Sequence, residues 1–270
     1  MKNYGALIIL IFITLQTQAQ FHEIGAFGGV SGYVGDLNPT NYFRPSGNAF
    51  GAFYRHNYNT RFSYKISAAK TSVLASDSDN PVSNLQERNL AFETPIYELA
   101  AVLEVSYFDF EVDEGENKFT PYMNFGVALF HYNPIGTYNG QEYNLRELGT
   151  EGQLLPGGQG KYSTVSVAFP LGLGMRYNFA GKWSLNAEIA LRYTATDYLD
   201  DAGGVYTDQN EILDRQGEAA AYFSNPSSSN RFGEPGQTRA SSTFNDTYTF
   251  ATFGISYTIK PFRCPRLSDF

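Results

Sequence analysis

The sequence has little of what several classes of protein need. Cys264 is the only cysteine in 270 residues, so no disulfide can form within the chain. The 19 Lys and Arg residues are outnumbered by 27 Asp and Glu, and a net charge of −8 leaves no basic face for a nucleic acid. No long apolar run follows residue 20, which excludes a bundle of membrane-spanning helices.

What the chain does contain favours β-structure. Its 20 Tyr, 22 Phe and 26 Gly residues form a mixture that is typical of strands joined by tight turns. A length of 270 residues suits one large β-domain, because barrels often exceed the usual domain length. The composition therefore predicts an all-β fold.

The first residues have the pattern of a secretory signal peptide. Lys2 precedes an apolar run over residues 5–15, and Ala19 supplies a small residue before a cleavage point. The run is well short of the roughly 20 residues that a spanning helix needs. We predict a signal peptide over residues 1–19, a barrel over 20–259 and a periplasmic tail over 260–270.

The most informative signal is alternation of apolar residues with small or polar ones, in segments of about ten residues. In the clearest segment, Phe169, Leu171 and Leu173 share one face, while Gly172 and Gly174 share the other. This pattern is typical of outer-membrane barrels, and an even number of strands suits a single bacterial chain. It predicts about eight antiparallel transmembrane strands, over residues 23–34, 48–56, 62–73, 97–107, 122–132, 165–178, 183–193 and 247–259.

The connections between these strands alternate in length. The segments 56–61, 110–118 and 179–182 are short, whereas the remaining four, 35–47, 75–93, 133–164 and 196–244, are longer. Outer-membrane barrels have short periplasmic turns and long outer loops, so both termini are expected in the periplasm. A soluble barrel also has one apolar strand face, but eight strands enclose too little space for so many bulky side chains. We therefore expect the apolar face to meet outer-membrane lipid.

The opposite face of the strands carries charges that would point into the lumen. Because charges in a space with little water must pair, we expect them to form salt bridges. A lumen of eight strands is normally filled by side chains, so a structural plug is favoured over a transport path. The predicted network consists of Glu98, Glu104, Arg176, Glu188 and Arg192.

The longest loop is rich in carboxylates, the ligands that calcium accepts. Their spacing matches no EF-hand, and a solvated acidic loop is the favoured interpretation. The residues concerned are Asp197, Asp200, Asp201, Asp208, Glu211 and Asp214.

Enzymatic motifs are missing. Nucleophilic catalysis by Ser or Cys needs a base within reach, and His22, His56 and His131 are the only histidines. The predicted topology places His56 and His131 on opposite sides of the membrane. No Gly-x-Ser-x-Gly or His-Glu-x-x-His motif occurs, so we predict a protein that is not an enzyme and needs no cofactor.

Three stretches resemble a known family. They are residues 23–39, which include Tyr33-Val34-Gly35-Asp36-Leu37, residues 196–201, which include Asp200 and Asp201, and Arg263-Cys264-Pro265. Together they are similar to the PorG-like outer-membrane barrels of Bacteroidota, over nearly the whole mature chain. The resemblance implies a component of the type IX secretion machinery, which joins the outer membrane to a periplasmic ring of a PorK-like lipoprotein and a PorN-like partner.

On this resemblance, Arg263, Cys264 and Pro265 become the positions that contact the periplasmic partner. Cys264 is either a free thiol or bonded to another chain, so a mixed disulfide with that partner is one option. The segment 202–204 departs from the family's pattern. The alternative function is a surface-exposed barrel that binds ligands or cells through its long loops.

Overall fold

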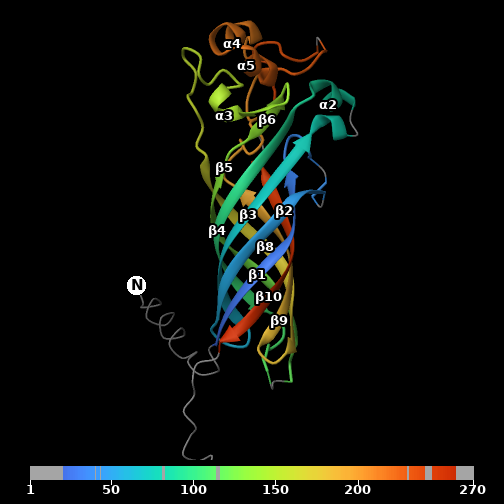
Figure 1. Ribbon diagram of the computed structural model, residues 1–270, viewed down its shortest axis with the longest axis vertical. Helices are drawn as coiled ribbons and strands as arrows, with labels where there is room; N and C mark the ends of the chain where they lie inside the picture. The colour runs from blue at the N-terminus through green and yellow to red at the C-terminus, as the bar shows by residue number, and fades with distance from the viewer. Residues whose placement is uncertain are drawn as a thin grey trace, which may run out of the picture.

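Eight long strands form a closed antiparallel barrel in which every strand pairs with its neighbours in sequence and β1 pairs with β10 (Figure 1). The computed structural model describes residues 21–39, 41–42, 44–80, 83–113, 116–229, 231–240 and 245–259. The predicted fold class is confirmed. The barrel strands are β1 (Phe21–Val34), β2 (Pro45–Asn57), β3 (Phe62–Ser76), β4 (Ala91–Ser106), β5 (Phe119–Tyr132), β8 (Val165–Ala180), β9 (Trp183–Thr194) and β10 (Thr247–Ile259).

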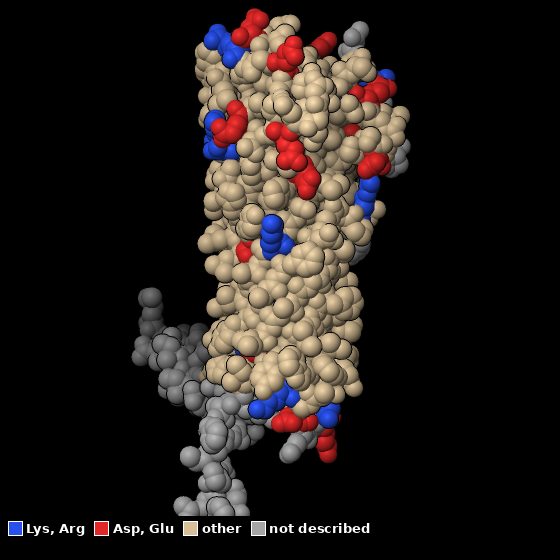
Figure 2. All heavy atoms as spheres, in the orientation of Figure 1, with Lys and Arg blue, Asp and Glu red and all other residues tan. Residues whose placement is uncertain are grey.

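The two faces of the strands differ as the alternation predicted. On β8, Leu171 and Leu173 are 50% and 68% exposed, whereas the intervening Gly172 is buried and Arg176 is 1% exposed. On β4, Leu99 and Leu103 face outward and Glu98 and Glu104 inward. The large apolar side chains therefore cover the outside of the cylinder. In Figure 2 the charged residues of this face gather at the two ends, with few between them.

The interior is closed by aromatic rings that lie over glycines of neighbouring strands. A Cβ on Gly25 would lie 2.5 Å from the ring of Phe53, and one on Gly174 would lie 2.3 Å from the ring of Tyr122. Contacts this short do not occur between real atoms, so these two positions need glycine. The glycines thus make room for bulky rings inside a narrow barrel.

The long loops fold into a cap at the upper end of the barrel (Figure 1). Among the residues that the structure describes, no helix is long and apolar enough to cross a membrane. The loop elements, which alternation could not predict, are η1 (Asp77–Asp79), α2 (Ser83–Arg88), β6 (Ile135–Tyr138), β7 (Gln141–Asn144), α3 (Leu145–Leu148), α4 (Gln209–Gln216) and α5 (Glu218–Ser224).

The cap has an apolar core of its own. Leu199 and Ile212 are completely buried, and Leu145 and Phe223 nearly so. The Asp208 side chain accepts a hydrogen bond from the backbone of Asn210 and so begins α4. The four long connections at this end of the barrel therefore form packed structure.

The first and last described residues of the barrel meet at the lower end, where His22 pairs with Ile259. Three turns lie at the same end, after β2, β4 and β8. The predicted signal peptide, residues 1–19, and the tail, residues 260–270, lie outside the described residues, as do the three contact positions Arg263, Cys264 and Pro265.

Candidate functional site

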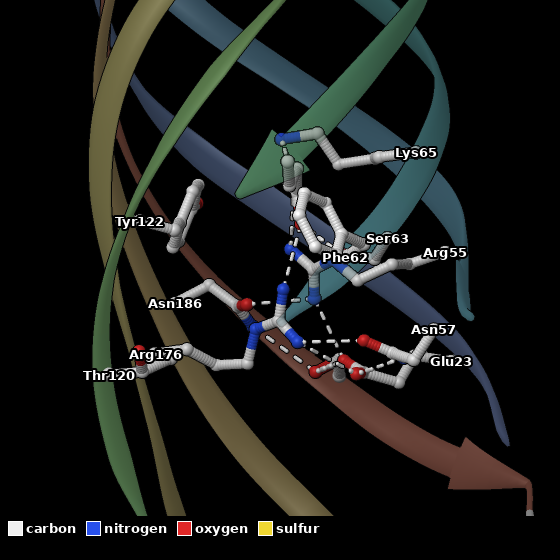
Figure 3. A network of polar contacts seen from close by, with 12 residues as sticks. Glu23, Arg55, Asn57, Phe62, Ser63, Lys65, Thr120, Tyr122, Arg176 and Asn186 are labelled. Carbon is white, nitrogen blue, oxygen red and sulfur yellow. Dashed lines mark hydrogen bonds and ion pairs between the residues drawn. The ribbon is translucent and has the colours of Figure 1, made fainter. Parts of the chain in front are cut away.

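The lower half of the lumen holds a network of charged side chains from β1, β2, β3, β4 and β8 (Figure 3). Glu104 lies at its centre, 2.6 Å from Arg55 and 2.7 Å from Arg176. Arg55 also pairs with Glu23 at 2.8 Å, and the side chain of Asn57 donates a hydrogen bond to Glu23. Each of these charged side chains is at most 1% exposed. Burial this complete is tolerated because every charge meets an opposite one.

Lys65 extends the network towards the middle of the barrel. Its Nζ lies 3.1 Å from Glu104 and 2.5 Å from Glu188. The hydroxyl of Tyr122 donates a hydrogen bond of 2.9 Å to the same Glu188. Lys65 therefore joins the lower charges to those of the barrel centre.

A second group of charges lies nearer the cap. Arg192 pairs with Glu98 at 3.1 Å, and its guanidinium lies 3.8 Å from the centre of the Phe250 ring. The hydroxyl of Tyr248 donates a hydrogen bond of 2.6 Å to Glu98. The two groups contain four cations and four carboxylates, so the lumen charge is balanced: Arg55, Lys65, Arg176 and Arg192 against Glu23, Glu98, Glu104 and Glu188.

The structure brings the five predicted lumen residues together in two places. Glu104 contacts Arg176 and Glu98 contacts Arg192, while Glu188 reaches the rest through Lys65. Glu23, Arg55 and Lys65 were not among the predicted lumen residues, although their strands were predicted correctly. Counting alternate positions along β1, β2 and β3 would have found them, because the flanking residues Ile24, Tyr54, Tyr64 and Ile66 all face outward.

The space left between the two groups is small. A cavity of about 30 Å³ lies among Lys65, Tyr122, Glu188 and Arg192. That volume holds about one water molecule. Among the described residues, side chains therefore fill most of the lumen at this level, and the interior is a packed core of charges.

The cap contains a second set of charges, some deeply buried. Arg239 donates hydrogen bonds to Glu151 and to the backbone oxygen of Asp201, and Arg88 forms two with Asp77. The side chains of Asp200 and Asp201 are hidden in the same region, with 4% and 0% exposure. The interpretation of the whole acidic segment as solvated is therefore wrong for these two. Both side chains can be buried at the base of the cap because residues of other segments donate hydrogen bonds to them.

Side-chain hydroxyls and a backbone N–H supply those partners. Asp200 accepts hydrogen bonds from the hydroxyl of Tyr33 at 2.6 Å and from the backbone of Ala202. Asp201 accepts from the hydroxyls of Thr150 and Tyr162. These bonds join the end of β1, the segment after α3 and the longest loop.

Burial disfavours the charged form of several cap carboxyls. It raises the pKa of Asp201 to about 6, although Arg239 and two hydroxyl donors oppose the shift. Burial, with the nearby charges of Asp36 and Glu151, raises the pKa of Asp197 to about 7. No group of three or more His, Cys, Asp or Glu side chains among the described residues is arranged to hold a metal ion.

The histidines lie at two ends of the barrel. His56 is near the lower end of β2 and His131 near the upper end of β5, as the topology predicted. His22 lies beside His56 on the outer surface, with 3.1 Å between their Nδ1 atoms, and its Nδ1 is 2.6 Å from the hydroxyl of Tyr54. The two rings are tilted by 40° with 4.7 Å between their centres, and they lie between Tyr54 and Tyr64 at the lower rim.

Fold and lumen together define a closed eight-stranded barrel with a charge-filled interior and a folded cap. The chain belongs to the family described as "Domain of unknown function (DUF6089)", whose model matches residues 2–216. No curated protein matches the sequence.

Several solved barrels have a similar structure. Neisserial surface protein A has 10% sequence identity and a TM-score of 0.45, with 87% of this chain and 96% of that chain covered. Ail, the attachment invasion locus protein of Yersinia pestis, has 12% identity and a TM-score of 0.42, covering 90% and 100%. OprG, an outer membrane protein from Pseudomonas aeruginosa, has 10% identity and a TM-score of 0.39, covering 90% and 97%.

Proposed function

We propose that this protein is a non-enzymatic, sealed barrel of the bacterial outer membrane that anchors a periplasmic ring of a type IX secretion machinery. The proposed place in the outer membrane rests on the combination of an apolar outer belt with a charge-filled lumen. A soluble protein would hide the apolar face and expose the charges. Here the arrangement is reversed, which suits a protein surrounded by lipid.

The height of the belt fits a membrane. On the outer face of β4, Tyr97 and Tyr107, the residue directly after the strand, enclose a stretch in which every outward side chain is apolar. Ten residues at about 3.4 Å each, tilted by about 45°, rise about 24 Å, which matches the apolar band of roughly 25 Å in outer-membrane barrels. Lys70 lies over the ring of Tyr97, where a long cationic side chain can reach the headgroups.

The closed lumen supports an anchoring role over transport. An eight-stranded barrel filled by paired charges has no path for a solute, so its contribution is to hold other components at the membrane. β10 ends at Ile259 beside the start of β1, and the chain continues from there into the tail. The resemblance to PorG-like barrels makes Arg263, Cys264 and Pro265 the proposed contacts to a PorK-like lipoprotein and a PorN-like partner.

A disulfide between Cys264 and a periplasmic partner is tested by running native membranes on non-reducing and reducing gels. Cys264→Ser is the matched variant. We expect the wild type to shift to higher mass only without reductant and the Cys264→Ser variant to stay monomeric. Deleting residues 260–270 should abolish secretion while the barrel still inserts. Intact secretion after that deletion would overturn the anchoring role.

A second function, surface binding through the loops, is favoured by the folded cap. Flexible loops would not need a buried core that includes Leu199, Ile212 and Phe223. A packed cap presents a fixed surface, as a binding site requires. Replacing residues 205–237 by a short linker would then abolish adhesion or ligand binding, whereas deleting the tail would leave it unchanged.

A further inference from the structure

The cap and the barrel enclose a groove to which neither proposed function assigns a ligand. It lies where the upper ends of β3 and β4 meet β6 and α5, and its cavity volume is about 320 Å³. That volume is within the range of small-molecule sites. We name it the cap groove; Phe92, Ile135, Tyr222 and Phe223 form its walls, and Glu93 and Glu142 lie among its outer residues.

The walls of the cap groove are held rigidly. The ring of Tyr222 stacks on Tyr138 with 4.4 Å between ring centres, and Phe223 is packed against Tyr143 and Tyr222. Phe92 is 5% exposed and packs edge-on against Tyr33. A single bridge, between Glu93 and Ile135, joins β4 to β6. The aromatic surface is therefore preformed, and a ligand would not have to order it.

The charges around the cap groove are unbalanced. Glu93 and Glu142 are exposed, and neither forms an ion pair with a cation in the described part of the chain. Arg239, the one cation among the lining residues, is already neutralised by Glu151 at 3.0 Å. Asp200, deeper in the groove, has its oxygens occupied by Tyr33 and Ala202. The groove thus combines aromatic walls with two free carboxylates.

We propose that the cap groove binds a small organic cation, with an apolar body against Phe92, Tyr222 and Phe223 and an ammonium group at Glu93 and Glu142. Aromatic faces attract cations as well as apolar groups. A carboxylate accepts charge-assisted hydrogen bonds from an ammonium group, so the two glutamates add to that attraction. An anion of the same shape would meet two negative charges and would be repelled. The site does not depend on the secretion or adhesion role of the protein.

The test uses the full mature chain in nanodiscs of zwitterionic lipid and three probes of similar shape. The probes are 2-phenylethylammonium, the neutral 2-phenylethanol and the anionic 3-phenylpropionate, measured by saturation-transfer NMR against empty nanodiscs. We expect saturable binding of the ammonium probe alone. The variant Glu93→Gln/Glu142→Gln should weaken it roughly ten-fold, because two partly exposed charge contacts are lost.

Glu218→Gln is the control, because it removes an exposed carboxylate of the same cap that does not line the groove. Its affinity for 2-phenylethylammonium should equal that of the wild type. Both substitutions are on the surface, so folding of the cap is expected to be unaffected. Equal binding of the three probes, an unchanged affinity in the double variant, or no saturable binding at about 10 mM would each overturn the proposal.

Discussion

Replacing Glu104 by leucine removes the carboxylate at the centre of the lumen network. The side chain is fully buried and accepts contacts from Arg55, Arg176, Lys65 and the hydroxyl of Ser63. Without it, three cations share two carboxylates, in a space with room for about one water molecule. Removing one partner of a buried ion pair costs about 3–5 kcal/mol, and we expect the Glu104→Leu variant to lose stability in this range.

The assay is urea unfolding of the barrel in lipid vesicles, followed by the gel shift between folded and unfolded forms. Glu116→Leu is the matched control, because it makes the same substitution at an exposed position of a lower turn. The control should unfold at the urea concentration of the wild type. A Glu104→Leu variant within about 1 kcal/mol of the wild type would refute the view that the network stabilises the barrel.

Three further outcomes are expected. Glu98→Gln and Arg192→Met should each destabilise the barrel, and the double variant should lose less than the sum, by about 0.5–3 kcal/mol, since the two residues form one pair; additive losses would argue against that coupling. In planar bilayers the wild type should show no regular conductance steps, and reproducible steps would contradict a sealed lumen. Because the pKa of Asp197 is raised from 3.8 to about 7, its protonated form stabilises the cap. This contribution is complete below about pH 4 and is lost as pH rises through 7. Amide protection factors in the cap, which are corrected for the intrinsic pH dependence of exchange, should fall over that range, and Asp197→Asn should remove part of the fall.

The sequence could predict the barrel because alternation is imposed residue by residue along each strand. All eight predicted segments lie within or close to the observed strands, and the direction of Leu173 and Arg176 follows from period two alone. The start of β4 was harder to predict from the sequence. Residues 91–96 extend above the apolar belt, where they pair with the upper end of β3. Alternation between apolar and polar residues is weaker there, because neither face meets lipid.

The cap could not be predicted by the same means. Its helices are short, and its loops are held together by contacts between residues far apart in sequence, such as Arg239 with Glu151 and Tyr33 with Asp200. Short helices depend on tertiary packing more than on propensity. The lumen was predicted in part, since charge and strand face can be assigned from sequence, whereas the central position of Glu104 required the register of the whole barrel.

A single tryptophan makes the most direct test of membrane insertion through the apolar belt. In a Trp183→Phe background, Leu103→Trp places the only indole at mid-belt, at an outward position that is 53% exposed. The variant is reconstituted in vesicles whose lipids carry bromine near the middle of the acyl chains. Insertion of the belt in lipid predicts strong quenching and blue-shifted emission, whereas unquenched emission like that of tryptophan in water would contradict it.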